Sequence, residues 1–260
     1  MDLGVTDRVA MVAASSKGLG YGVAKALAMD GARVSMCSRT ESEITDAAQR
    51  LQKETNGEAL ATACDVTDPR DLKKWLDRTL DKWGRVDMLL ANTGGPPAAS
   101  FKELTDEQWQ SAFELTLMST IRMIRMVLPH MQSGSAILTI TSSSVREPIE
   151  RLGLSNVMRS GVVALVKTLA DELSGDGIRI NNLIPGRIDT DRVDQLDRNT
   201  AQRSGLTFEE VRRRSQEKIP LQRLGSTDEF GSAGAFLLSP AASYITGTSL
   251  VVDGGTMRSI

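Results

Sequence analysis

Short apolar segments alternate with longer helical patterns along almost the whole chain. The helical patterns include residues 41–54, 69–83, 106–131 and 154–173, and the apolar segments are residues 8–14, 32–38, 58–66, 86–92, 135–142, 178–185 and 249–255. Strands that alternate with helices in this way are typical of βαβ units, in which each strand returns parallel to the last. The alternation therefore predicts an α/β fold, with a doubly wound, seven-stranded parallel sheet and helices on both faces.

One segment departs from this alternation. Residues 191–224, between the sixth strand and the last helix, have a polar helical pattern that predicts an insertion closing over a substrate pocket. Within it, Arg212, Arg213 and Arg214 are interpreted as a solvated helix face, with docking of a phosphate-bearing carrier or coenzyme as the alternative. No linker divides residues 1–260, so a single domain is expected, with ligands at the carboxyl ends of the strands.

The composition excludes several classes of function. A net charge of −2 gives the protein no general positive field that would attract nucleic acid. The chain shows neither a basic and apolar signal segment nor a long apolar span, so a cytoplasmic protein with no membrane partner is expected. With His130 as the one histidine beside Cys37 and Cys64, no metal site is expected. The cysteines are interpreted as small buried residues, and a disulfide is the alternative because both lie near the ends of neighbouring strands.

A glycine-bearing loop follows the first strand. Residues 13–20 are AASSKGLG, in which Gly18 and Gly20 open the first helix. Glycines allow the backbone to approach a pyrophosphate, and the free N–H groups at a helix amino end attract phosphate. The pattern alone is a weak signal, because glycines also serve as packing points between helices and strands.

Further landmarks follow in order along the chain. They are CDV at 64–66, ANTG at 91–94, TSSS at 141–144, PGRIDT at 185–190 and YITGTSLVVDGG at 244–255. Together with the loop they resemble the short-chain dehydrogenase/reductase family over essentially the whole chain, and in particular its 3-oxoacyl-acyl-carrier-protein reductases. The resemblance implies a single-domain Rossmann fold, a nicotinamide cofactor, hydride transfer to or from a carbonyl or alcohol carbon, and a homo-oligomer, either a dimer or a tetramer.

The resemblance also implies the cofactor contacts, position by position. The cofactor phosphates would contact the loop residues Ser15, Ser16, Lys17, Gly18, Leu19 and Gly20, and Asp65 and Val66 would lie beside the adenine. Asn92 and Gly94 would approach the ribose. The nicotinamide carboxamide would contact Pro185, Gly186, Ile188 and Thr190. Thr93 either places a hydroxyl near the nicotinamide or only packs. The family usually begins its loop with Thr-Gly, and Ala13-Ala14 stands here instead, so the loop is expected to follow a slightly different path.

Charge at the end of the second strand indicates which nicotinamide cofactor binds. An acidic residue there would hold the ribose 2′-hydroxyl, but this strand ends in Ser38 and Arg39. Arg39 can bind a 2′-phosphate through two hydrogen bonds of its guanidinium, and Lys17 can add a second positive charge. We expect NADP(H); the alternative is that Arg39 is only a surface residue.

The catalytic positions depart from the better-known branch of the family, which has a serine and then a tyrosine followed four residues later by a lysine. Aligned on the fifth strand and on KTLADEL, the serine is Ser142, the tyrosine position is Ser155 and the lysine position is Arg159; an expected asparagine falls on Thr116. Ser155 and Arg159 share a helix face, but a serine hydroxyl is a poor acid and an arginine does not relay a proton. Ser143, Ser144 or a protonated Glu147 are alternative hydrogen-bond donors to a substrate carbonyl.

Two functions from different classes remain open at this point. The first is an NADPH-dependent reductase of a small-molecule carbonyl, with an altered catalytic set. The second is an NADP(H)-binding sensor or structural partner without turnover, and a lyase or epimerase is a weaker third. The segment GGPPAASF, residues 94–101, is expected to form a stiff, mainly apolar pocket wall with Phe101, which favours an acyl-like substrate over a sugar.

Overall fold

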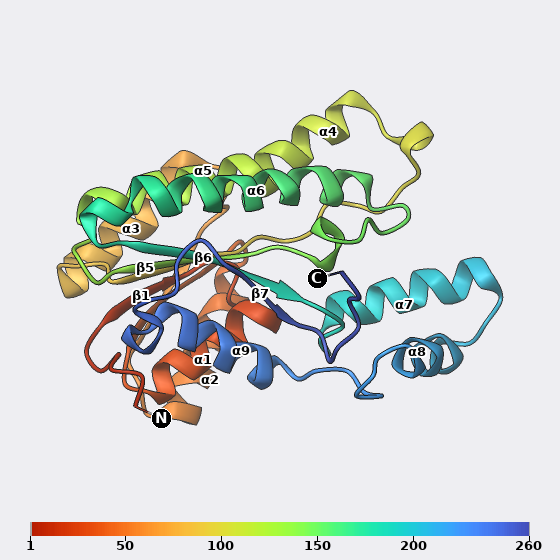
Figure 1. Ribbon diagram of the computed structural model, residues 1–260. Coiled ribbons are helices and arrows are strands. Elements are labelled where there is room, and N and C mark those ends of the chain that lie inside the picture. The colour runs from red at the N-terminus through yellow and green to blue at the C-terminus, as the bar shows by residue number, and fades with distance from the viewer. Residues whose placement is uncertain (1, 260) are drawn as a thin grey trace.

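The computed structural model describes residues 2–259, and its centre is one parallel sheet (Figure 1). The strand order is β3-β2-β1-β4-β5-β6-β7. The strands are β1 (Val9–Val12), β2 (Arg33–Ser38), β3 (Ala59–Ala63), β4 (Met88–Ala91), β5 (Ala136–Ile140), β6 (Arg179–Pro185) and β7 (Ser249–Val252). The predicted fold class is confirmed. Because the winding reverses between β1 and β4, a ligand crevice is expected outside the carboxyl ends of these strands.

Helices cover both faces of the sheet (Figure 1). One face carries α1 (Gly18–Met29), α2 (Glu41–Thr55) and α9 (Thr227–Leu238), and the other carries α3 (Pro69–Trp83), α4 (Asp106–Ala112), α5 (Ser119–Val127) and α6 (Gly153–Glu172). Each layer has its own core. Leu27, Ile44 and Phe230 are buried on the first face, and Trp75 and Met123 on the second. Burial of both sheet faces explains why the strands are apolar throughout rather than alternating.

The long helix expected over residues 106–131 is not continuous. A π-helical turn, Phe113–Met118, separates α4 from α5, and residues 128–130 tighten into a 3₁₀ turn. Thr116, one of the four expected catalytic residues, lies in the π turn. Single π turns inside helices are often found at functional sites, because they displace one side chain from the regular spacing. The apolar periodicity of the sequence does not reveal such a turn.

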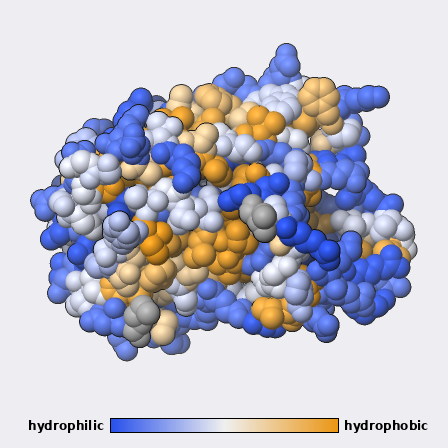
Figure 2. All heavy atoms as spheres, in the orientation of Figure 1, coloured by the Kyte–Doolittle hydropathy of each residue, from blue (hydrophilic) through white to orange (hydrophobic). Residues whose placement is uncertain are grey.

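Cys37 and Cys64 are both buried and both are free thiols, so the disulfide alternative is not realised. Burial raises the pKa of the Cys37 thiol well above its usual value. Across residues 2–259, none of the helices has the length and apolar character needed to cross a bilayer. Figure 2 shows an apolar patch over the edge strand β7, where Leu250 and Val251 are exposed.

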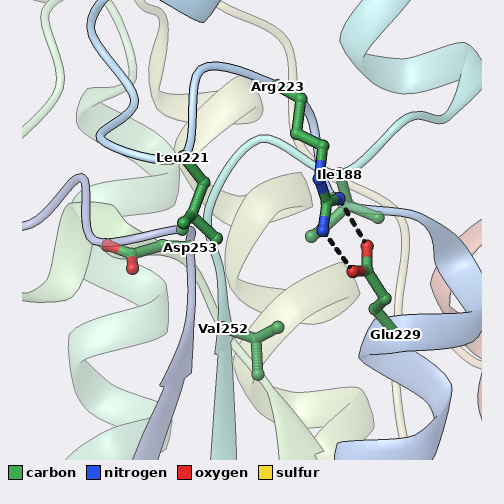
Figure 3. A pocket seen from close by; sticks show the side chains of 8 residues that line it. Ile188, Leu221, Arg223, Glu229, Val252 and Asp253 are labelled. Atoms are coloured by element: carbon green, nitrogen blue, oxygen red, sulfur yellow. Dashed lines mark hydrogen bonds and ion pairs between the residues drawn. The ribbon is translucent and has the colours of Figure 1, made fainter.

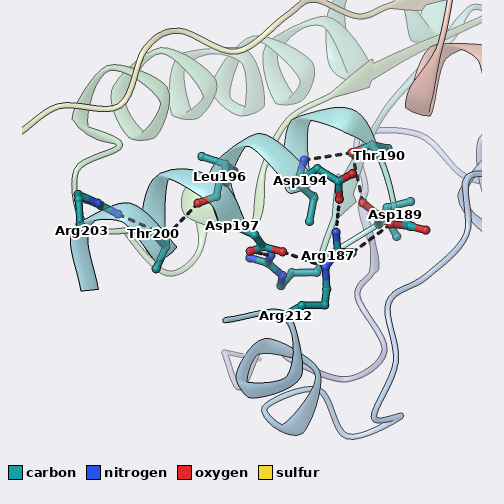
Figure 4. Close-up of polar contacts among 11 residues, drawn as sticks. Arg187, Asp189, Thr190, Asp194, Leu196, Asp197, Thr200, Arg203 and Arg212 are labelled. Atoms are coloured by element: carbon teal, nitrogen blue, oxygen red, sulfur yellow. Dashed lines mark hydrogen bonds and ion pairs between the residues drawn. The ribbon is translucent and has the colours of Figure 1, made fainter. Parts of the chain in front are cut away.

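Residues 191–217 form two helices, α7 (Asp191–Ser204) and α8 (Phe208–Glu217), which stand beside the carboxyl ends of the strands (Figure 1). A buried ion network joins them (Figure 4). Asp197 of α7, whose side chain is 2% exposed, pairs with Arg187 from the β6–α7 loop and with Arg212 of α8. Arg212 also pairs with Asp189 and Asp194. The interpretation of Arg212 as a solvated residue was wrong, because folding surrounds it with carboxylates.

The Asp197 network predicts a large and specific loss of stability. Asp197→Asn should lower the free energy of unfolding by about 3 to 5 kcal/mol, because it leaves two cations without their buried partner. Asp189→Asn removes an exposed partner of the same Arg212 and should cost less than about 1 kcal/mol. Urea denaturation of the two variants measures both values. Equal losses would show that the buried carboxylate does not hold the two helices.

Candidate active site at the carboxyl edge of the sheet

The loop between β1 and α1 forms a tight backbone cradle. Gly20 has no room for a side chain, because a Cβ there would lie 2.3 Å from the Ala14 carbonyl oxygen. Gly18 has a φ of 62°, and Ala14, which stands where the family resemblance implies glycine, has a φ of 49°, also in the left-handed region. Alanine in this region costs about 1 kcal/mol. The Ser15 hydroxyl donates to Val12 O at 2.8 Å, so the amino end of α1 presents backbone N–H groups rather than that hydroxyl.

Three cations surround the outer side of this cradle. Arg39 is exposed and forms no ion pair within the described chain. Lys17 Nζ lies 2.9 Å from an Asp191 carboxylate oxygen, and this contact raises the pKa of the Lys17 ammonium. Arg50 of α2 donates to Ser16 O at 3.1 Å and stacks 4.2 Å over the Tyr21 ring. Arg50 was missed in the sequence because no motif marks it; only the packing of α2 beside the loop brings it there.

Most of the residues expected beside the adenine and the adjoining ribose contact neighbouring residues of their own loops or the core. An Asp65 carboxylate oxygen accepts from the backbone N–H and the hydroxyl of Thr67, at 2.9 and 2.8 Å. Val66 is largely buried in the second core, and the Ser38 hydroxyl lies 3.5 Å from Thr40 O. Asn92 Nδ2 donates to Ala13 O at 3.4 Å, which ties the end of β4 to the phosphate loop.

The loop after β6 faces the phosphate loop across the edge of the sheet. A Cβ on Gly18 would lie 3.6 Å from Cγ2 of Thr190, the residue whose hydroxyl caps α7. Pro185 ends β6, and Gly186 must be glycine because a Cβ would lie 2.4 Å from the Asp253 Cβ. The two loops therefore approach closely enough for one extended ligand to contact both, as the sequence predicts.

Ile188, expected at the nicotinamide, is instead turned inward. Its side chain is 3% exposed and lines a small pocket of about 110 Å³ with Leu221, Val252 and the Arg223–Glu229 ion pair (Figure 3). Pockets for small molecules usually enclose about 300 to 1,000 Å³, so this pocket is too small for a dinucleotide.

Arg159 is the charged group at the centre of the site. It lies on α6 and is 8% exposed, with Nη1 donating to Ile140 O at 2.8 Å and Nη2 reaching Gly94 O at 3.4 Å. The Thr93 hydroxyl donates to the same Gly94 oxygen. Burial, and secondarily the charge of Arg192, lower the pKa of Arg159 to about 10, so it remains charged at neutral pH. The guanidinium thus joins the carboxyl ends of β4 and β5.

Several hydroxyl groups lie on α6 or on elements that pack against it. Ser142 Oγ accepts from the Ser144 N–H at 3.2 Å, and its own proton is free to be donated. Ser155, one turn before Arg159, is 7% exposed and forms no side-chain hydrogen bond within the part of the chain described. The hydroxyl oxygens of Thr116, Thr141 and Ser144 are buried without partners. Unpartnered buried hydroxyls are costly, and several on elements that pack on α6 indicate a site that receives a polar group.

The structure brings together the elements that carry Thr116, Ser142, Ser155 and Arg159, since both the π turn and the segment after β5 pack against α6. No hydrogen bond joins any two of these four side chains in residues 2–259. Glu147, considered above as a protonated donor, is exposed and accepts from the backbone N–H groups of Arg258 and Ser259. These bonds lower the pKa of Glu147, so it is an ionised anchor for the C-terminal segment and not a proton donor.

Comparisons with known proteins agree with this geometry. Residues 13–257 match the family model described as enoyl-(acyl carrier protein) reductase. The chain is 32% identical over 254 residues to dehydrogenase/reductase SDR family member 4 of Oryctolagus cuniculus, covering 96% of this chain and 94% of that protein. The L-sorbose reductase of Gluconobacter frateurii, solved with NADPH and L-sorbose, is similar with a TM-score of 0.94 and 28% identity, over 100% of both chains.

A second solved structure is an NADPH-bound short chain oxidoreductase from Pseudomonas aeruginosa PAO1 that contains an atypical catalytic center. Its TM-score is 0.88 and its identity 28%, covering 98% of this chain and 100% of that one. Family model, relatives and solved structures agree over nearly the full length, and the chain belongs to the short-chain dehydrogenase/reductase family.

Proposed function

We propose that this chain is an NADP(H)-dependent oxidoreductase that transfers a hydride between NADPH and a carbonyl or alcohol substrate. The observation that carries the proposal is the charged guanidinium of Arg159, buried between the carboxyl ends of β4 and β5. A buried cation that meets only backbone carbonyls is stabilised by an electron-rich partner, such as a ribose oxygen or a developing alkoxide.

The residues present fit the cofactor. The Gly20 position admits only backbone, and the amino end of α1 offers N–H groups to the pyrophosphate. Lys17, Arg39 and Arg50 would attract a 2′-phosphate, which supports NADP(H) over NAD(H). Arg159 would hold the nicotinamide ribose, and the segment from Pro185 to Thr190 would meet the carboxamide. Lys17 would exchange Asp191 for phosphate, because both side chains are exposed.

The bound cofactor supplies the hydride that the carbonyl carbon accepts. The protein's own residues act on the oxygen: the free proton of Ser142 is donated in a hydrogen bond, and the charge of Arg159 stabilises the negative charge that develops. Ser155 lies on the same face of α6, but its hydroxyl is too weak an acid to replace a phenol. Loss of a positioned acid costs about 10² to 10⁴ in rate, so a slow or specialised reductase is expected.

The pocket wall supports an acyl-like substrate, including the 3-oxoacyl class. The segment from Gly94 to Phe101 contains two prolines, and it is held by Ala99 N–H donating to Arg151 O at 2.9 Å. Phe101 is 79% exposed and packs edge-on against Trp109. Apolar residues on a fixed loop favour the carbon chain of a substrate over a polyhydroxylated one.

The second candidate is an NADP(H)-binding protein without turnover. It is favoured by the absence of tyrosine and lysine at positions 155 and 159. Both candidates require the same nucleotide site. We also propose a homo-oligomer, a dimer or a tetramer, which the exposed apolar residues of the edge strand β7 support (Figure 2). The cytoplasmic location expected from the sequence stays a prediction.

Turnover separates the two candidates. Purified protein with NADPH and a panel of aliphatic carbonyls, including a 3-oxoacyl thioester, should lose the absorbance of reduced nicotinamide with at least one substrate, and NADH should serve less well. NADPH binding without consumption for every carbonyl would favour the non-catalytic candidate. Equal activity with NADH and NADPH would contradict the proposal that Lys17, Arg39 and Arg50 bind the 2′-phosphate.

Two buried arginines provide a matched test of the nucleotide site. Arg159→Met should weaken NADPH binding by at least about tenfold, while Ser155→Ala should not. Arg179, 9% exposed, donates to the carbonyls of Leu237, Ser239 and Ile245 far from the site. Arg179→Met should therefore cost about 3 kcal/mol of stability or more, with little effect on NADPH affinity.

Calorimetric titration with NADPH and urea denaturation of the three variants check these expectations. Arg159 makes two hydrogen bonds to carbonyls and Arg179 makes three, so removal of Arg159 should cost the free protein less stability than removal of Arg179. Equal effects of Arg159→Met and Ser155→Ala on NADPH affinity would contradict the assignment of Arg159.

A further inference from the structure

A second cation rests on the same wall that Arg159 reaches. Arg192, in the first turn of α7, donates through Nη2 to Pro96 O at 3.1 Å and through Nη1 to the Gln195 side chain at 3.2 Å. A Cβ on Gly95 would lie 3.3 Å from the same Nη2. Arg159 meets Gly94 O at 3.4 Å. The two guanidinium groups are thus held by a three-residue segment, one from α6 and one from α7.

Neither of these two arginines pairs with a carboxylate in residues 2–259, whereas Arg187, Arg212 and Arg213 all do. Burial lowers the pKa of both Arg159 and Arg192, and the charge of Arg192 lowers that of Arg159 further. Arg159 is buried, whereas Arg192 is exposed and its charge is partly screened by water. The two like charges still repel one another, and neutral carbonyl oxygens compensate the buried charge of Arg159 incompletely. A ligand that carries negative charge would relieve this repulsion.

The cofactor phosphates have their own partners. The amino end of α1 and the exposed cations Lys17 and Arg39 lie on the phosphate side, and Lys17 is bound by Asp191, the residue before Arg192. Arg192 instead donates to Pro96 O, in the segment after Gly94 that would contact the substrate. The ligand that meets Arg192 is therefore the substrate rather than the nucleotide.

We infer that Arg192 binds a carboxylate of the substrate, which makes the substrate a small oxo acid. The inference rests on the proposed function, because Arg159 must lie at the reacting carbonyl. A planar guanidinium matches a carboxylate in a two-point hydrogen bond. Both arginines donate hydrogen bonds to residues 94–96. A substrate carboxylate bound by Arg192 therefore lies only a few bonds from the substrate carbonyl carbon beside Arg159. The apolar wall contacts the carbon chain between the two groups.

A charge-matched pair of substrates tests the inference. Acetoacetate and methyl acetoacetate carry the same ketone, but only the first is anionic. In each case the ketone carbon accepts a hydride from NADPH and its oxygen a proton from solvent, giving the 3-hydroxy product and NADP⁺. The wild type should favour the acid over the ester by at least about tenfold in kcat/KM. Arg192→Met should lose this preference, mainly through KM for the acid.

Arg203→Met is the matched control. Arg203 lies at the far end of the same helix and is exposed (Figure 4). Within residues 2–259 its side chain bonds only to Asn199 O and the Thr200 hydroxyl. The Arg203→Met substitution removes the same charge from α7 and should leave the preference for the acid over the ester unchanged. Loss of the preference in both variants would reduce the effect to net charge on the helix, which would overturn the inference.

The affinity of the NADP⁺ complex for butyrate, measured by titration calorimetry, separates this inference from the proposed function. Butyrate should bind the wild type and Arg203→Met, and at least about tenfold more weakly to Arg192→Met. If neither ketone is reduced but this pattern holds, the reductase proposal fails and the anion site stands. The inference is overturned by equal butyrate affinity in all three proteins, by no butyrate binding to the wild type, by an ester preference in the wild type, or by weakened NADPH binding in Arg192→Met.

Discussion

The buried charge of Arg159 is the constraint on which the site depends. A guanidinium that is 8% exposed has lost most of its hydration, and the carbonyls of Ile140 and Gly94 replace only part of it. The protein can hold this charge because the ends of β4 and β5 are fixed by the sheet, so their carbonyls point at α6 without further ordering. What remains uncompensated is available to a nucleotide sugar or to a developing alkoxide.

The arginines of this protein fall into two groups by their partners. Arg179 is surrounded by carbonyls, and Arg187 and Arg212 share the carboxylate of Asp197, so each has an internal partner that serves stability. Arg159 meets the carbonyls of Ile140 and Gly94, and Arg192 meets Pro96 O and the Gln195 side chain, but neither pairs with a carboxylate within residues 2–259. The Asp197 network joins α7 to α8 and to the β6–α7 loop (Figure 4). The first turn of α7 carries Arg192, which donates to Pro96 O.

If Ser155 and Arg159 occupy the tyrosine and lysine positions, as the sequence alignment proposes, the chemistry changes more than the geometry. Ser155 and Arg159 remain on one buried face of α6, beside the π turn that carries Thr116. Hydrogen-bond donors and positive charge are retained, whereas an acid of moderate pKa is lost. The site thus keeps the means to bind a dinucleotide and to stabilise an oxyanion, and it gives up the group best able to deliver a proton quickly.

The sequence by itself determined the parallel sheet, because uninterrupted apolar strands alternating with helices have few other ways to bury both faces. It also indicated the tight glycine-bearing loop before α1 and the place of Arg159 on α6, since both follow from local spacing along single elements. Tertiary structure alone decided the π turn at Thr116, the inward turn of Ile188, the burial of Arg212 and the approach of Arg50 and Arg192 to the site. Each of these depends on contacts between segments far apart in the chain, and such contacts leave no periodic or local signal in the residues that make them.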